Sequence, residues 1–500
     1  MLPRAIAIST RGLLFGLPLL ILVIFVSTNL LLGWDFSIDT LTSSFLVHED
    51  ALCPGYIDHL HELNLTHKIN YARRDIFVKS RDDSKRSPII RVKKKLFPRH
   101  QIIEAADAIP VKFQGCVKPL TLEVPSAPSQ WPKTPHLLFG TSTDLETLEV
   151  SLPILGRWLP NTGAKLIAYI EDGAQDTAQG SMQERLEDLQ FQMQSKGMQV
   201  ELIRPPAAVE KSPEASLFLL KHIYENRSGE TQWISLIRPE TLFTSISLLA
   251  STLSKYDSRE QHYVGAVSEE WWTVIHYGLM GSLRSGIFIS LPLVEALMDE
   301  IDYCDSIRPV NATIGDYRIM RCINELTNIR LAQERSLHSM DLNGDLSGFF
   351  ESGRIPLSLY TGKGDVEGTD NVDIDYPSMH LITDICPSCL LYRWRFNSDM
   401  ILSTSYSIAK YTKGALKGAR MDIMEETWDK PRSTDGAHLH PAEHSVGPVR
   451  EALKLDEEKV QHRMVASKVL EDGGVRESYL HRGVNGDLDS VLEIVWRIEQ

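Results

Sequence analysis

Short apolar runs alternate with longer segments of helical periodicity through the middle of the chain. Runs typical of buried strands lie at residues 136–140, 165–170, 199–203, 262–266 and at the start of 233–243. Residues 182–196, 215–224 and the segment through Leu249 and Leu253 place apolar side chains on one helical face. Strands separated by helices of this length predict parallel crossover connections. We therefore expect an α/β fold, with a mostly parallel sheet flanked by helices.

The run at residues 233–243 breaks its apolar pattern at Arg238, Pro239 and Glu240. In an open α/β sheet, ligands bind outside the carboxyl ends of the strands. These three residues are therefore predicted to face a bound substrate. Earlier in the chain, residues 141–146 place hydroxyl and carboxylate side chains ahead of a periodic apolar run, which is typical of a capped helix start.

The N-terminal region contains an uncharged segment rich in leucine and isoleucine at residues 12–34. Arg4 and Arg11 precede it and Asp35 follows it. At about 20 residues, such a segment is long enough to span a bilayer as a helix. The positive charges predict that residues 1–11 are cytoplasmic and that the rest is luminal, which is the type II arrangement. A cleaved signal peptide is the alternative, although it would have a shorter apolar core and small residues at a cleavage site.

The rest of the chain divides by composition. Residues 35–131 have scattered apolar runs and end in a Pro- and Ser-rich stretch, which predicts a luminal stem. Residues 132–413 hold the alternating strands and helices of the main domain. Residues 414–500 are predicted to form an accessory extension, with a helix around 449–470 and a final strand at 491–496. The basic run from Arg91 to Lys95 is interpreted as solvated charge, with a membrane-surface or partner site as the alternative.

Composition narrows the classes of partner. The 500 residues are 43% hydrophobic and 24% charged, as in ordinary globular proteins. The net charge is -14. This balance argues against nucleic acid, because a phosphate-binding surface needs Lys and Arg that outweigh the carboxylates.

Two further features fit an oxidising secretory lumen. Six cysteines form an even set that such a compartment would pair. The expected pairs are Cys386 with Cys389, Cys304 with Cys322, and Cys53 with Cys116. Three sequons are candidate N-glycosylation sites, at Asn64, Asn226 and Asn311.

A series of short motifs extends over most of the chain. It comprises Leu138-Phe-Gly-Thr-Ser-Thr143, Ser151-Leu-Pro153, Thr162-Gly-Ala-Lys-Leu166, Glu269-Glu-Trp-Trp272, His276-Tyr-Gly278, Gly286-Ile-Phe-Ile-Ser290, Gly315-Asp316, Gly344-Asp-Leu-Ser-Gly-Phe349 and Glu351-Ser-Gly-Arg354. In this order and spacing, the motifs resemble the fungal, Fringe-related branch of the family 31 glycosyltransferases. The resemblance covers nearly all of the predicted luminal chain, from Cys53 to Trp496.

This resemblance implies a type II membrane enzyme of the Golgi or endoplasmic reticulum with a nucleotide-sugar-binding, GT-A-like fold. Such enzymes transfer a sugar from a UDP-sugar donor to a glycan or glycoprotein acceptor, with inversion at the anomeric carbon. Manganese is the usual cofactor, because a divalent cation stabilises the diphosphate leaving group.

The sequence departs from the family pattern where the metal would bind. The strand before Arg238 normally ends in an acidic triplet, and here only Glu240 carries a carboxylate. Tyr360 replaces a histidine that is a candidate metal ligand, and Leu283-Arg284-Ser285-Gly286 is bulkier than the family's glycine-rich cleft floor. No metal is therefore expected at Arg238, Pro239 and Tyr360. Arg238 and Arg284 are predicted to supply positive charge to the diphosphate instead.

The sequence retains a candidate catalytic base on the acceptor side of the predicted site. Inverting transfer needs a carboxylate that takes the proton of the attacking hydroxyl. Asp316, at the start of a predicted helix over residues 317–324, matches the family's acid, and a helix N-cap is the alternative role. Trp271 and Trp272 are predicted to stack on the donor, unless they belong to the core. His276 and His338 are further site candidates, with structural histidines as the alternative.

Three functions follow from these residues. The first is a glycosyltransferase with a degenerate metal site. The second is an inactive pseudo-glycosyltransferase that acts as a binding or chaperone subunit. The third, a soluble hydrolase or redox protein, is disfavoured, because the sequence shows no Ser-His-Asp ordering, no HExxH motif and no paired CxxC motifs.

Overall fold

The computed structural model describes residues 58–65, 68–81, 87–104, 117–126, 133–171, 182–204, 215–269, 271–306, 315–342, 344–362, 374–418, 420–421, 423–429, 446–484 and 486–499. The predicted anchor at 12–34, the pair Cys53 and Cys116, and the sequon at Asn311 lie outside these ranges. Within them, no helix is both long and apolar enough to cross a membrane.

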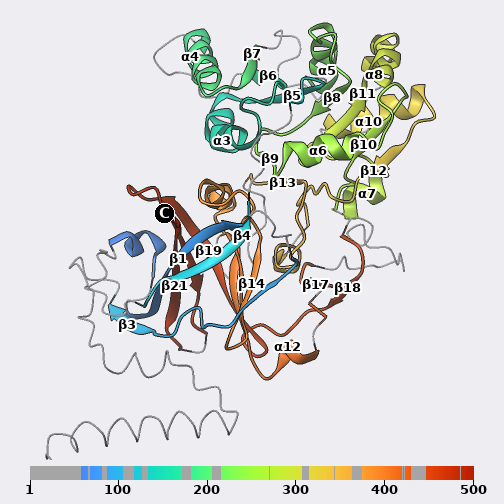
Figure 1. Ribbon diagram of the computed structural model, residues 1–500. Coiled ribbons are helices and arrows are strands. Elements are labelled where there is room, and N and C mark those ends of the chain that lie inside the picture. Colours follow the sequence, from blue (N-terminus) through green and yellow to red (C-terminus); the bar gives the residue numbers. More distant parts are fainter. Residues whose placement is uncertain are drawn as a thin grey trace, which may run out of the picture. The chain divides into compact units, whose positions relative to one another are not determined.

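A seven-stranded sheet forms the α/β part of the chain (Figure 1). Its order is β12-β10-β11-β8-β5-β6-β7. The strands are β5 (Leu137–Asp144), β6 (Lys165–Glu171), β7 (Gln199–Ile203), β8 (Trp233–Leu236), β10 (Tyr263–Gly265), β11 (Ile287–Ser290) and β12 (Leu331–Gln333). Only β11 runs against the others, because it pairs antiparallel with both β8 and β10. The predicted α/β class is confirmed, with a mixed sheet in which most pairs are parallel.

Helices cover both faces of this sheet. Alternate residues of one strand enter different cores, as Phe139 and Leu138 of β5 do. Side chains of α3 (Leu145–Trp158), α4 (Met182–Ser195) and α6 (Ile246–Leu253) pack with Phe139. Those of α5 (Ala215–Glu225), α8 (Leu291–Met298) and α10 (Gly315–Leu326) pack with Leu138. The capped helix start is also confirmed, because the Asp144 carboxylate accepts a hydrogen bond from the Thr147 backbone N–H at 2.8 Å.

A second, ten-stranded sheet joins the two ends of the described chain, with blue strands beside red ones in Figure 1. Its order is β2-β14-β15-β16-β19-β20-β21-β1-β3, and β4 pairs with β1. The strands are β1 (Lys68–Arg81), β2 (Ile90–Val92), β3 (Gln101–Glu104), β4 (Leu120–Pro125), β14 (Arg393–Phe396), β15 (Met400–Ser403), β16 (Ser407–Tyr411), β19 (Lys459–Val469), β20 (Val475–His481) and β21 (Asp489–Ile498). Segments assigned by sequence to a stem and to an extension therefore share one sheet.

The final strand predicted at 491–496 is confirmed as β21, but the helix predicted at 449–470 is wrong. That region contains β18 (Val449–Glu451), which pairs with β17 (Met424–Glu426), and then β19. Lys459, Gln461 and Arg463 of β19 are buried although they are polar. The alternation of apolar and polar residues that marks a strand is therefore missing from its sequence.

Two predicted disulfides are present in the structure. Cys304 of α9 (Ile301–Ser306) is bonded to Cys322 of α10, and Cys386 is bonded to Cys389. The second pair lies just after η2 (Tyr376–Asp384) and is buried. This disulfide therefore closes a short turn and is not an accessible redox site.

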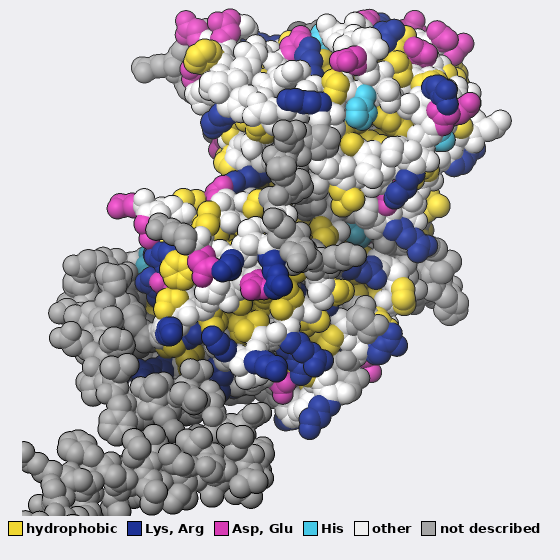
Figure 2. All heavy atoms as spheres, viewed as in Figure 1, with side chains coloured by type: hydrophobic (Ala, Val, Ile, Leu, Met, Phe, Trp, Pro, Cys, Tyr) yellow, Lys and Arg dark blue, Asp and Glu magenta, His cyan; other side chains and the backbone are white. Residues whose placement is uncertain are grey.

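Charged side chains are unevenly spread on the surface. Figure 2 shows Lys and Arg side chains gathered near α12 (Ala415–Gly418). Among the exposed residues are Lys93, Lys94 and Lys95 of the predicted basic run. Their exposure agrees with the interpretation of that run as solvated charge.

Candidate functional site

The carboxyl ends of six strands lie at one edge of the seven-stranded sheet, because these strands run in the same direction. Beyond β8, the chain passes through Arg238 and Glu240 into β9 (Thr241–Phe243). The Arg238 N–H donates to the Leu283 carbonyl at 3.1 Å, and the Thr241 hydroxyl donates to the Arg284 carbonyl at 3.1 Å. These bonds hold the loop that carries Arg284 beside the end of β8.

Tyr360 joins this group from a distant part of the sequence. It ends β13 (Ser358–Tyr360), which pairs antiparallel with β9 and sets Tyr360 opposite Thr241. Its hydroxyl donates to Glu240 Oε1 at 3.4 Å, and Arg284 Cζ lies 5.0 Å from the centroid of its ring. Burial and the Glu240 carboxylate raise the pKa of Tyr360. The phenol is therefore neutral at physiological pH and sits between a cation and an anion.

Two guanidinium groups outnumber the carboxylate in this cluster. Arg238 is exposed and Arg284 is half-buried, so both can approach a ligand. Glu240 Oε2 is buried and has no hydrogen-bond partner among the described residues. A donor group on a ligand could satisfy this oxygen. We call Arg238, Glu240, Arg284 and Tyr360 the arginine cluster.

A divalent metal does not fit the arginine cluster. Manganese and magnesium prefer several oxygen ligands from carboxylates, carbonyls or water. The cluster offers one carboxylate and a neutral phenol, and Arg284 lies against that phenol. Within the described ranges, no group of three or more His, Cys, Asp or Glu side chains is arranged to hold a metal. Sequence analysis assigned all four residues to the donor or metal positions, with Tyr360 as a degenerate metal position, and the pairing of β13 with β9 sets Tyr360 opposite Thr241.

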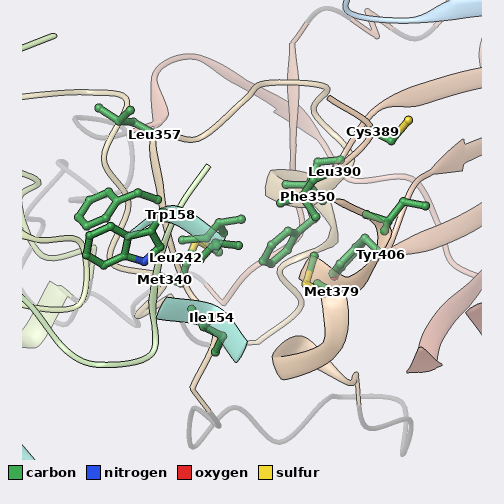
Figure 3. Packing of buried hydrophobic residues seen from close by; sticks show 14 of the residues in the cluster. Ile154, Trp158, Leu242, Met340, Phe350, Leu357, Met379, Cys389, Leu390 and Tyr406 are labelled. Carbon is green, nitrogen blue, oxygen red and sulfur yellow. The ribbon is translucent and has the colours of Figure 1, made fainter. Parts of the chain in front are cut away.

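The core behind β9 keeps the arginine cluster in place. The Trp158 indole N–H donates to the Thr241 carbonyl at 3.2 Å, and its ring meets Phe243 edge-on at 5.0 Å between centroids. Further along, Phe350 stacks on Tyr406 with 4.4 Å between centroids, and Figure 3 shows the two rings facing each other. Phe350 belongs to α11 (Ser347–Phe350) and Tyr406 lies beside β16, so the large sheet supports the segment that leads to Tyr360.

A second group of polar residues lies near β13. His338 Nδ1 is 2.9 Å from Glu269 Oε1, and Glu269 Oε2 accepts from the Met340 N–H at 2.9 Å. Glu269 and His338 are 1% and 3% exposed. The backbone N–H of His338 also donates to the Ser358 hydroxyl at 3.4 Å. Ser358 and Tyr360 are two residues apart on β13, so their side chains share one face of the strand.

Asp341 completes this second group. Its Oδ1 accepts from the Glu269 N–H at 2.8 Å and from the Ser339 hydroxyl at 2.6 Å. Its Oδ2 accepts from the Ser268 hydroxyl at 2.7 Å. Burial and the neighbouring Glu269 raise the pKa of Asp341 to about 6. Sequence analysis named His338 and quoted Glu269 within a motif, but it missed Asp341, because a single carboxylate 72 residues away carries no pattern.

The raised pKa of Asp341 predicts a pH dependence of stability. The folded chain holds this proton more tightly than the unfolded chain, so the group stabilises the fold below about pH 4. That contribution is lost as pH rises towards about 6, and it amounts to about 2–3 kcal/mol. Urea unfolding of Asp341→Asn should show a flatter pH profile than the wild type between these values. Parallel profiles would contradict the assignment.

For the acceptor-side candidates Trp271, Trp272 and Asp316, the structure describes the position of the backbone. Helix α7 (Trp271–Tyr277) follows β10 and begins with Trp271 and Trp272, and Asp316 is the second residue of α10. Their side chains lie outside the described part of the structure. Helix α10 leads into β12, which runs parallel to β10, so the first turn of α10 lies at the same edge as the arginine cluster. His276 is exposed on α7.

Comparison with known proteins gives a partial match. Residues 277–359 match a family described as "Protein of unknown function, DUF604". The matched stretch contains Arg284, Asp316 and His338, and it overlaps motifs that carry the resemblance to Fringe-related glycosyltransferases. Assignment to the fungal branch stays a prediction. No curated protein matches the chain.

Several solved structures resemble part of the chain. The glycosyltransferase GlyE of Streptococcus pneumoniae TIGR4 matches with 12% identity and a TM-score of 0.26, over 41% of this chain and 45% of its own. Mouse xyloside xylosyltransferase 1 matches with 11% identity and a TM-score of 0.26, over 39% of this chain and 84% of its own. The 4-diphosphocytidyl-2C-methyl-D-erythritol synthase of Anaerococcus prevotii DSM 20548 matches with 11% identity and a TM-score of 0.25, over 40% of this chain and 90% of its own. The chain thus spans less than half the length of GlyE.

Proposed function

We propose that this chain is a glycosyltransferase that moves a hexosyl group from a UDP-sugar to a glycan or glycoprotein acceptor, with inversion. The observation that carries the proposal is the arginine cluster at the carboxyl end of β8, where Arg284 lies over Tyr360 and Tyr360 donates to Glu240. Two guanidinium groups at the ligand-binding edge of an α/β sheet suit a diphosphate, since their planar forks match phosphate oxygens.

Each residue then has a role in the transfer. Asp316 takes the proton from the acceptor hydroxyl, and the hydroxyl oxygen attacks the anomeric carbon from the face opposite the leaving group. The bond between that carbon and the diphosphate oxygen breaks, and UDP departs with the electron pair. Arg238 and Arg284 balance the charge that develops on the diphosphate. Glu240, which accepts from Tyr360, holds this tyrosine beside the two arginines.

A screen of UDP-sugars tests this function. The purified full-length protein is incubated with UDP-glucose, UDP-galactose, UDP-N-acetylglucosamine and UDP-xylose, and release of UDP is measured. We expect at least one donor to be hydrolysed slowly by water alone, and to be turned over faster when an acceptor is present. If no donor is hydrolysed or bound, the proposal is wrong.

Arg284 gives a sharper prediction for donor binding. Replacing it with alanine removes a charge-assisted contact with the diphosphate, so the Kd for UDP should rise roughly 10- to 100-fold. Arg284→Lys should recover only part of the affinity, because an ammonium lacks the planar fork. Calorimetric titration with UDP measures all three proteins. Arg259→Ala is the control, since Arg259 is an exposed arginine that pairs with Asp257 at the surface. Equal affinities for Arg284→Ala and the wild type would exclude this role.

The compartment belongs to the same proposal. An uncleaved helix at residues 12–34 would anchor the chain in the Golgi or endoplasmic reticulum membrane with the rest in the lumen. Asn64 and Asn226 are both exposed, as glycan acceptors must be. The two internal disulfides also suit an oxidising compartment.

A second function is favoured by one observation, the replacement of family metal positions by Arg238, Pro239 and Tyr360. A pseudo-glycosyltransferase that binds a partner enzyme would need no turnover. The two functions separate in the UDP-sugar screen, because an inactive subunit would release no UDP from any donor with or without acceptor.

A further inference from the structure

Two tyrosine rings meet at the edge of the sheet that carries the arginine cluster. Tyr277 ends α7, and Tyr317 lies in the first turn of α10. Their ring centroids are 5.0 Å apart, and the rings are inclined at 54°. Both side chains are half-buried and pack against the core beneath α5 and α8. We call them the tyrosine pair.

The tyrosine pair is held rigidly from one side. The Arg321 guanidinium donates to the Tyr317 hydroxyl at 3.0 Å. Arg321 is itself paired with Glu325 at 3.0 Å, four residues further along the same helix. The charge of this arginine is therefore matched within α10.

The two rings combine apolar and polar character. Leu279, which follows the end of α7, is a further exposed apolar residue close to Tyr277 in the chain, with 61% of its surface exposed. The half-buried faces of Tyr277 and Tyr317 and their hydroxyls themselves make a surface with a mixed apolar and hydroxyl character. Aromatic surfaces with polar tips are suited to ligands that have one apolar face and a hydroxylated edge.

The connections of the chain set this surface beside the predicted base. Asp316 immediately precedes Tyr317, and Trp271 and Trp272 begin the helix that Tyr277 ends. Helix α10 spans 12 residues and β12 begins five residues after its last residue. Because β12 starts at the amino edge of the sheet, the beginning of α10 must lie at the opposite, carboxyl edge. The arginine cluster lies at that same edge, at the end of β8.

We propose that the tyrosine pair is the acceptor subsite and binds the C–H face of a neutral pyranose in a glycan. The inference rests on the proposed function, in which Asp316, the residue before Tyr317 in the chain, takes the proton of the acceptor hydroxyl. A pyranose has one face made of C–H bonds and a rim of hydroxyls, which match the tyrosine rings and their polar tips. A charged sugar is disfavoured, because Arg321 is already matched by Glu325.

Saturation-transfer NMR on the full-length protein tests the subsite. The probes are the methyl β-glycosides of glucose, galactose and N-acetylglucosamine, each added in the presence of UDP. We expect signal from at least one glycoside in the wild type. In Tyr277→Leu and in Tyr317→Leu, which keep apolar volume but lose the ring, binding should weaken about three- to tenfold. Tyr317→Phe keeps the ring and should retain most of the signal.

A matched control comes from Tyr303 of α9, which is 48% exposed and has no place in the pair. Tyr303→Leu should leave glycoside binding unchanged. Equal losses in Tyr303→Leu and in the two test variants, or a wild type that binds none of the glycosides, would overturn the subsite. UDP binding is measured on the same samples. A wild type that fails to bind UDP counts against the donor site, whereas a glycoside signal that survives both leucine variants counts against the tyrosine pair alone.

Discussion

Replacing Lys459 with methionine is expected to lower the free energy of unfolding by about 3–5 kcal/mol, because the change leaves buried carboxylates without their cation. Lys459 is fully buried in β19. Its Nζ lies 2.7 Å from Glu351 Oε2 and 3.3 Å from Glu425 Oε2. The same contacts raise the pKa of Lys459 and lower the pKa of Glu351, so Lys459 and Glu351 form a charged pair in the folded protein. Urea unfolding followed by circular dichroism measures the loss.

The effect of Lys459→Met should extend to the donor site. Glu351 follows α11 and precedes β13, which carries Tyr360. Loosening Glu351 should therefore weaken UDP binding as well as stability. Lys413→Ala provides the control, because Lys413 pairs with Glu457 at 3.5 Å while both side chains are more than 60% exposed. A surface pair of this kind contributes at most about 1 kcal/mol. Similar losses for the two variants would show that the buried network is not needed.

Gly348→Ala is expected to destabilise the same region by about 3 kcal/mol or more. A Cβ on Gly348 would fall far inside contact distance of the Glu425 carbonyl oxygen, which is backbone and cannot rotate away. The surroundings are also fixed, because the Gly348 N–H donates to the Thr427 hydroxyl at 2.9 Å and that hydroxyl donates to the Asp345 carbonyl at 2.6 Å. Either α11 or β17 must move. Thermal unfolding of the variant measures the loss.

The matched control for Gly348→Ala is Gly229→Ala. No atom lies within 4 Å of a Cβ built on Gly229, and its backbone is not in the left-handed region. This change should alter stability by no more than about 0.5 kcal/mol. If Gly348→Ala were equally harmless, the close packing of α11 on β17 would be contradicted.

These two predictions concern one network, in which Lys459 and Glu425 come from the segment that the sequence placed in an extension. Glu351 and Gly348 precede Tyr360 in the chain, while Lys459 and Glu425 belong to strands near the C-terminal end. The network therefore connects the large sheet to the segment that forms one wall of the candidate donor site. A chain cut at residue 414 would lose Lys459 and Glu425, and with them the support of Glu351.

Local patterns were enough to predict the α/β part of the fold. The strand at residues 165–170 is a short apolar run, and the helix at 182–196 has an apolar periodicity of 3.6 residues. These two elements and the strand at 199–203 each appear within a residue or two of their predicted bounds. The capping role of Asp144 was equally local, because it depends on residues next to one another.

The ten-stranded sheet could not be predicted in this way. One of its parallel pairs joins β1 to β21 across more than 400 residues, with Ile69 opposite Asp489. Strand β19 turns Lys459, Gln461 and Arg463 inward to meet carboxylates from other segments, so its sequence is not that of an ordinary strand. Both features depend on long-range partners, which a single sequence does not reveal.

The candidate site could likewise be predicted only in part. The strand ending at Arg238 and the substitution at Tyr360 were visible in the sequence, but their meeting depends on β9 pairing with β13. The Glu269, His338 and Asp341 group depends on two loops that are about 70 residues apart. The tyrosine pair, likewise, joins helices that are separated by β11, α8 and α9.

The central claim is that arginines, and not a divalent metal, meet the charge of the donor diphosphate. Calorimetric titration of the full-length wild type with UDP, once with EDTA and once with manganese chloride, tests it most directly. We predict the same Kd for UDP in both solutions, and a gain of manganese dependence in a variant with Arg238 and Pro239 both changed to aspartate. UDP binding by the wild type that appears only with manganese, and vanishes with EDTA, would contradict it.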